Sequence, residues 1–129
     1  MKWHEYDIKD EGGHRRRWFQ YKTYDLVLWL DSDESVNRLQ FSFPIRLPDP
    51  NSTQGYILRE GVFEFSKTNG ARLLAVTDEH SNFPTPKLLV KDANNLGLNE
   101  ALQVIQKTHD GIPKHLLQTI ISEIEKFFP

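Results

Sequence analysis

Cysteine is absent from the 129-residue sequence, and its apolar runs are short. Without thiols the chain can form no disulfide, no thiolate metal site and no cysteine nucleophile, which suits a reducing compartment. The longest apolar run, Leu26 to Leu30, is far shorter than the roughly 20 residues of a membrane-spanning helix. The first residues also lack the apolar stretch of a secretory signal peptide, so we expect a cytosolic protein with no membrane association.

Neither sign of charge is in large excess. The chain carries 16 Lys and Arg residues against 18 Asp and Glu residues, which gives a formal net charge of -2. No overall positive field would therefore attract nucleic acid or an anionic membrane, and binding of either kind would have to be local. The length is that of one ordinary domain, and we expect residues 1–129 to form a single domain.

Hydrophobic periodicity divides the chain into two parts. Roughly residues 14–76 show the alternation typical of strands, whereas residues from about 96 onwards show the three-and-four spacing of helices. The apolar stripe of the last helix has to be buried, and the apolar face of the strands is the surface that can accept it. We therefore expect an α+β fold, in which an antiparallel sheet of about five strands forms a meander of hairpins over residues 14–76 and two C-terminal helices pack on one face.

The first expected hairpin joins strands over Tyr24–Asp31 and Val36–Ile45 through the polar loop Ser32-Asp33-Glu34-Ser35. A register that sets Leu28 opposite Leu39 keeps the apolar side chains on one face, and a slip of one residue would break this agreement. The same register predicts the neighbour pairs Trp29–Arg38, Val27–Gln40, Asp25–Ser42 and Asp31–Val36.

A second hairpin is predicted at Asn69-Gly70, because both positions of this dipeptide tolerate the positive φ of a type I′ turn. Pairing around this turn sets Phe65 opposite Leu74 and Phe63 opposite Val76. Gly61, earlier in the same strand, is predicted to form a bulge or turn.

Proline and glycine mark the remaining boundaries. The stretch from Leu47 to Gly55 contains two prolines, which cannot donate to a ladder, and is predicted to be an exposed loop. Asn99 is predicted to cap a helix that runs to about His109, with Gly111 as the stop signal. Pro113 suits the first turn of the final helix.

Three short motifs follow one another near the N-terminus: Arg16-Arg17-Trp18-Phe19, Asp25-Leu26 with Trp29, and Leu39-Gln40-Phe41. They resemble a family of small bacterial proteins in which an Arg-Arg-Trp-Phe strand is followed by an Asp-Leu-x-x-Trp strand and then by a strand with an aromatic residue next to Gln. Leu39 stands before Gln40 where the family pattern has the aromatic residue. The resemblance covers less than a quarter of the chain. Because no activity is established for that family, it implies a bacterial origin and a shared sheet, and no reaction.

The candidate site is a basic and aromatic face of the sheet. If Phe19 faces the core, strand alternation sends Arg16 and Trp18 to the opposite side. There they join side chains of the next two strands, and the predicted binding residues are Arg16, Trp18, Trp29, Arg38 and Gln40. Rings stack on flat groups and guanidinium forks match carboxylates and phosphates, so one interpretation of this face is that it binds a small anion or an acidic peptide.

Three other interpretations of this face stay open. An arginine can lie across a tryptophan as a cation–π pair that stabilises the sheet and binds nothing. A homodimer would cover the same face. Single-stranded nucleic acid would also use rings and guanidinium groups, although the balanced charge and the lack of an RNA-recognition strand signature argue against it.

The alternative from another class is a small hydrolase-like enzyme that uses acidic residues near Asp31, Asp33, Asp78 and Glu79. Against it, the sequence has no phosphate-binding loop, dinucleotide fingerprint or serine elbow. A calcium loop starting at Asp31 would need glycine at its sixth position, where Val36 stands. The five histidines are scattered. We therefore predict no catalytic residue, no cofactor and no metal site, and we favour binding over catalysis.

Overall fold

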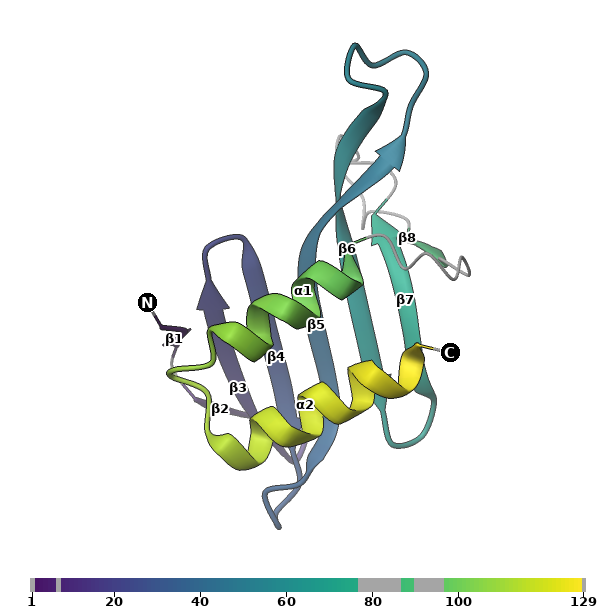
Figure 1. Ribbon diagram of the computed structural model, residues 1–129. Coiled ribbons are helices and arrows are strands. Elements are labelled where there is room, and N and C mark those ends of the chain that lie inside the picture. The colour runs from purple at the N-terminus through teal and green to yellow at the C-terminus, as the bar shows by residue number, and fades with distance from the viewer. Residues whose placement is uncertain (1, 7, 77–86, 90–96, 129) are drawn as a thin grey trace.

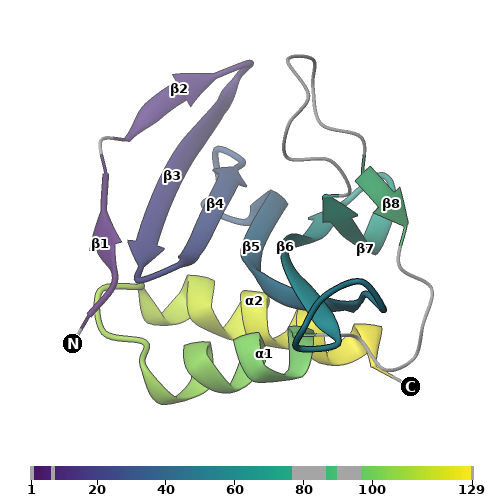
Figure 2. The ribbon, with the colours of Figure 1, turned by 90° about the horizontal axis from the view of Figure 1, so that it is seen from above.

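A computed structural model describes residues 2–6, 8–76, 87–89 and 97–128 (Figure 1). These residues form one antiparallel sheet and two helices, and both helices lie against the same face of the sheet (Figure 2). The structure therefore has the α+β architecture that the sequence predicts, with the helices at the C-terminal end of the chain.

The described residues form an eight-stranded sheet with the order β1-β3-β4-β5-β6-β7-β8, and β2 also pairs with β3. The strands are β1 (His4–Glu5), β2 (Lys9–Glu11), β3 (His14–Tyr21), β4 (Tyr24–Leu30), β5 (Val36–Pro48), β6 (Tyr56–Ser66), β7 (Gly70–Val76) and β8 (Lys87–Leu89). The five long strands, β3 to β7, form the predicted meander. Strands β1, β2 and β8 add two or three residues each at the ends of the sheet, and segments this short show no period in the sequence.

The register predicted between β4 and β5 is confirmed along most of its length. Leu28 lies opposite Leu39 and Trp29 lies opposite Arg38. A bulge between Trp29 and Leu30 then shifts the pairing, so that Val36 faces Leu30 and the predicted Asp31–Val36 pair is wrong. The cause is the turn, which closes through a 2.9 Å hydrogen bond from the Asp31 amide to the Ser35 carbonyl.

The register predicted between β6 and β7 is wrong. Phe65 lies opposite Ala71 and Phe63 lies opposite Leu73, three residues away from the predicted pairing. The connection is longer than a two-residue turn, and Gly70 takes its positive φ of 72° where β7 begins. Because an odd shift exchanges the two faces of a strand, Leu73 lies on the same face as Phe63, and Leu74 lies on the other.

Strands β5 and β6 continue past their neighbours as a long two-stranded arm (Figure 1). Leu47 pairs with Ile57 and Pro48 pairs with Tyr56 in this arm, so the predicted loop was too long at its start and spans residues 49–55. Gly61 lies in regular register opposite Phe43 and forms no bulge. A Cβ at Gly61 would lie 2.6 Å from Ile45 Cγ2, so close packing explains this glycine.

The two helices are α1 (Leu98–Lys107) and α2 (Lys114–Phe127). Helix α1 begins earlier than predicted, because Gly97 and not Asn99 is its N-cap residue. Gly97 has a φ of 85°, and a Cβ there would lie 2.8 Å from the Pro44 carbonyl oxygen. Pro113 directly precedes α2, close to its predicted place.

The core lies between the helices and one face of the sheet. Fully buried side chains from the sheet meet fully buried side chains from the helices, and these include Leu26, Leu28, Leu39, Phe41, Phe63, Ile105, Ile120 and Ile124. Trp3, for which the sequence pattern predicted no role, also belongs to this core. Its indole N–H donates a 2.7 Å hydrogen bond to the Thr108 carbonyl, which ties the N-terminal segment to the connection between the helices.

Candidate functional site on the open face of the sheet

All five predicted binding residues lie on the face of the sheet opposite the helices, in two adjacent cross-strand rows. The first row runs across the strands in the order Arg16, Trp29, Arg38, Ser66 and Gly70. The second row runs in the order Trp18, Val27, Gln40, Glu64 and Arg72. We call these ten residues the open face.

At the centre of the first row, the guanidinium group of Arg38 lies over the ring of Trp29. Its Cζ atom is 4.6 Å from the ring centroid. Arg38 is exposed and Trp29 is half-buried. A guanidinium group in a cation–π contact keeps its N–H donors, which can still bind a carboxylate.

Trp18 is held more firmly than Trp29. Its indole N–H donates a 2.9 Å hydrogen bond to Asp25 Oδ1, and Tyr6 stacks on its ring with the centroids 4.4 Å apart. The Tyr6 hydroxyl in turn donates a hydrogen bond to Gln20 Oε1. Tyr6 lies in the segment between β1 and β2, and no role was predicted for this segment from the sequence. One side of the Trp18 ring is therefore covered by the protein's own N-terminal segment.

The second row contains a chain of polar contacts that was not predicted from the sequence. Gln40 Nε2 donates a 3.0 Å hydrogen bond to Glu64 Oε1, and Arg72 binds the other oxygen, Oε2, through Nε at 2.9 Å and Nη2 at 2.8 Å. Glu64 is only 9% exposed. The predicted β6–β7 register set Arg72 three residues out of place, so its pair with Glu64 could not be predicted.

A hollow of about 390 Å³ lies beside this chain at the β6–β7 turn. Its lining includes the charged residues Arg38, Glu64 and Arg72 together with the polar residues Asn37, Ser66, Thr68 and Asn69. Two positive charges against one negative charge give these side chains a net charge of +1. The hollow forms where the first row ends in the small residues Ser66 and Gly70.

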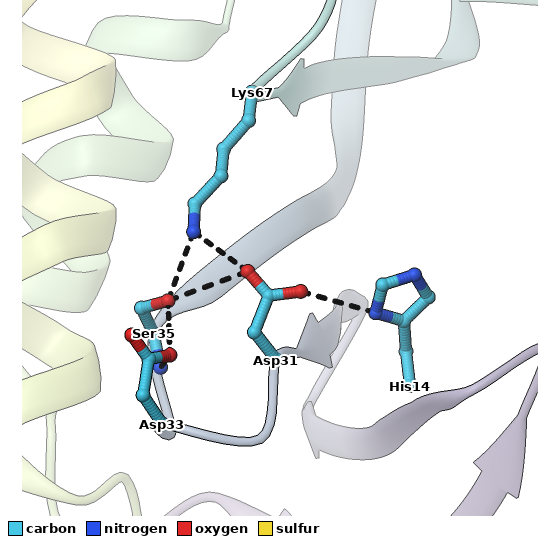
Figure 3. Close-up of polar contacts among 5 residues, drawn as sticks. All are labelled: His14, Asp31, Asp33, Ser35 and Lys67. Atoms are coloured by element: carbon cyan, nitrogen blue, oxygen red, sulfur yellow. Dashed lines mark hydrogen bonds and ion pairs between the residues drawn. The ribbon is translucent and has the colours of Figure 1, made fainter.

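A second polar cluster joins three turns at one end of the sheet (Figure 3). Lys67 Nζ lies 2.6 Å from Asp31 Oδ2, and His14 Nδ1 lies 3.2 Å from Asp31 Oδ1. Ser35 donates hydrogen bonds to Asp33 Oδ1 from its hydroxyl, at 2.6 Å, and from its amide, at 3.0 Å. The cluster therefore connects the start of β3 with the turns that follow β4 and β6.

These contacts shift the pKa values of three side chains in the cluster. The hydrogen bond from Lys67 lowers the pKa of Asp31, and the hydrogen bonds from Ser35 lower the pKa of Asp33. The pKa of Lys67 is raised by Asp31. Lys67 donates to the Ser35 hydroxyl at 2.9 Å, but a lysine with a raised pKa is a poor base for activating a serine.

Of the four residues named for the enzymatic alternative, Asp31 and Asp33 lie in this cluster, whereas Asp78 and Glu79 lie outside the described residues. In the described part of the chain, no three histidine or acidic side chains are grouped so that they could hold a metal ion. Neither described helix is long and apolar enough to cross a membrane.

Comparison with known proteins finds no matching family model, no matching curated protein and no matching solved structure. The function is therefore argued from the open face itself.

Proposed function

We propose that the protein is a binding module and that its open face holds an acidic peptide. The observation that carries this proposal is the position of Arg38, which is exposed and lies over the ring of Trp29 at the centre of a polar sheet face. The ring contact holds the guanidinium group at this place on the face before a ligand arrives. Bidentate contacts between guanidinium and carboxylate groups are strong and directional, so a guanidinium group held in this place favours a carboxylate ligand.

The arrangement of the first row also supports a peptide. Arg16 and Arg38 flank Trp29 on the two neighbouring strands, and adjacent strands lie about 4.8 Å apart. The two arginine positions are thus about 10 Å apart across the sheet, a span that a few peptide residues cover. Half-buried tryptophans give the same surface the rigid aromatic contact area that is common in protein interfaces.

Charge on the face favours a peptide over single-stranded nucleic acid. Glu64 lies in the second row, and Asp25 holds the Trp18 indole at the edge of the face. A phosphate backbone crossing both rows would pass close to these carboxylates, which would weaken its binding. The carboxylates of a short acidic peptide lie on separate flexible side chains, so some can lie beside the arginines while the others point into solvent.

The test is calorimetric titration of the protein with a blocked hexaglutamate peptide, with blocked hexaglutamine as the neutral control peptide. We expect hexaglutamate alone to bind. Arg38→Gln should weaken this binding about tenfold, because a hydrogen bond to a charged group contributes about 1.5–3 kcal/mol. Arg46→Gln is the matched control, because Arg46 lies over the Tyr56 ring, with its Cζ atom 5.0 Å from the centroid, on the arm outside the open face.

Equal effects of Arg38→Gln and Arg46→Gln would contradict the proposal, since general charge would then explain the binding. Stronger binding of a thymidine oligonucleotide than of hexaglutamate would favour the nucleic-acid alternative. Sedimentation at two concentrations tests the homodimer, and a dimer that Trp29→Ala dissociates would show that the open face is covered by a second copy.

A further inference from the structure

The hollow beside Arg38 is lined by charged residues of the second row as well as by the first row. It is lined by a second arginine, Arg72, whose side chain is 62% exposed. Its volume of about 390 Å³ lies within the usual range of small-ligand sites, about 300–1,000 Å³. We propose, building on the proposed function, that this hollow is a carboxylate-binding pocket in which Arg72 binds an acidic side chain of the peptide and Glu64 positions Arg72.

Glu64 is the reason for assigning Arg72 a fixed role. A glutamate that is only 9% exposed is unusual in a sheet, and here both of its oxygens are occupied, one by Gln40 and one by Arg72. Arg72 uses Nε and Nη2 for the same carboxylate oxygen. Two donors on one acceptor fix the orientation of a guanidinium group, which has five N–H donors in all.

The other lining groups suit an oxyanion. Asn37, Ser66, Thr68 and Asn69 contribute neutral polar side chains, so the two arginines outweigh the single glutamate. The Ser66 hydroxyl accepts a 3.0 Å hydrogen bond from the Asn69 amide, which braces the β6–β7 turn at the rim of the hollow. The hollow is thus a polar site of net positive charge built on two paired strands and a braced turn.

Two roles for Glu64 make opposite predictions. If Glu64 only neutralises Arg72, then Glu64→Gln adds one net positive charge to the hollow and should tighten the binding of an anion. If Glu64 positions Arg72, then Glu64→Gln releases the guanidinium group and should weaken binding in spite of the more favourable charge. We expect Glu64→Gln to weaken hexaglutamate binding about fivefold, which is less than the tenfold loss expected when the arginine itself is removed, because the released guanidinium group keeps its charge and can still reach the ligand.

The experiment repeats the calorimetric titration with hexaglutamate on three further variants. Arg72→Gln should weaken binding about tenfold, and Arg72→Lys, which keeps the charge but not the fork, should recover only a small part of this loss. Arg15→Gln is the matched control, because Arg15 is also exposed and paired with a glutamate, at 3.1 Å from Glu34, but lies outside the two rows. It should bind hexaglutamate as the unaltered protein does.

The outcomes separate this inference from the proposed function. If Arg38→Gln weakens binding but Arg72→Gln does not, the pocket is refuted while the open face remains the binding surface. Tighter binding by Glu64→Gln, or full binding by Arg72→Lys, would refute the positioning role. No binding of hexaglutamate by the unaltered protein would overturn both proposals. Should Glu64→Gln fail to fold, the two Arg72 variants decide the matter, since Arg72 is exposed.

Discussion

Two neighbouring residues of β4 show how differently the two faces of the sheet are built. Leu28 is fully buried beneath the helices, whereas Trp29 is half-buried on the open face under the guanidinium group of Arg38. The covered face is held by burial of apolar area, to which each large side chain contributes about 1.5–3 kcal/mol. The exposed positions of the open face are held by single polar and cation–π contacts, which contribute about 1 kcal/mol or less, and only Glu64 is buried there, between Gln40 and Arg72. Substitutions on the covered face should therefore change stability, and substitutions at exposed positions of the open face should change binding.

The largest effect should come from Phe41→Ala on the covered face. Phe41 is fully buried and its ring lies within contact of Trp3, Tyr24 and Phe43. We expect the free energy of unfolding in urea to fall by about 3–5 kcal/mol, because the surrounding core cannot fill the cavity. Ser42→Ala, one residue further along β5 and on the other face, is the control, and it should change stability by about 0.5 kcal/mol or less. Equal losses in the two variants would remove the distinction between the faces.

A smaller effect on the free energy of unfolding is expected from substitutions of Trp3 and Trp29. Trp3→Phe keeps an aromatic ring in the core but removes the hydrogen bond to the Thr108 carbonyl, so we expect a loss of about 1–2 kcal/mol in urea unfolding. Trp29→Phe on the open face should lower stability by less than about 1 kcal/mol, because the ring there remains partly in contact with water. A greater loss at Trp29 than at Trp3 would mean that the open face is part of the core.

The smallest effect concerns the polar cluster at the end of the sheet. Lys67 lowers the pKa of Asp31, so their ion pair stabilises the fold above the ordinary carboxyl pKa, about 3.9, and this contribution is lost as the pH falls through the lowered pKa. Lys67→Gln should therefore lower the midpoint of urea unfolding at pH 7. It should leave the midpoint nearly unchanged at a pH below both the ordinary and the lowered pKa of Asp31. A difference of the same size at both pH values would contradict this account.

The sequence predicts the arrangement of the sheet wherever a long alternating strand sets the register. In β4 and β5, the alternation of apolar and polar residues is long enough to place Arg38 beside Trp29. The same alternation places Arg16, Trp18 and Gln40 on the face opposite the helices, as predicted.

What the sequence could not predict depends on turn length and on contacts between distant residues. Asn69-Gly70 suits a two-residue turn, but in the structure the β6–β7 turn is longer and Gly70 lies at its end. The longer turn changes the register, and this change brings Arg72 opposite Glu64, a pair that the predicted register did not contain. Trp3 reaches the connection between the helices, 105 residues away in the chain, and a single contact of this kind leaves no periodic trace.

The three tryptophans allow the most direct test of the central claim, which is that the helix-covered face of the sheet forms the core and the open face binds an acidic peptide. Each indole N–H gives its own signal in a ¹⁵N–¹H spectrum, and these signals can be followed during titration with hexaglutamate. We expect the signals of Trp29 and Trp18 to shift, with Trp29 moving more because Trp18 is covered by Tyr6, and the signal of the buried Trp3 to stay in place. A shift of Trp3 as large as that of Trp29, or no shift of any of the three, would contradict the account.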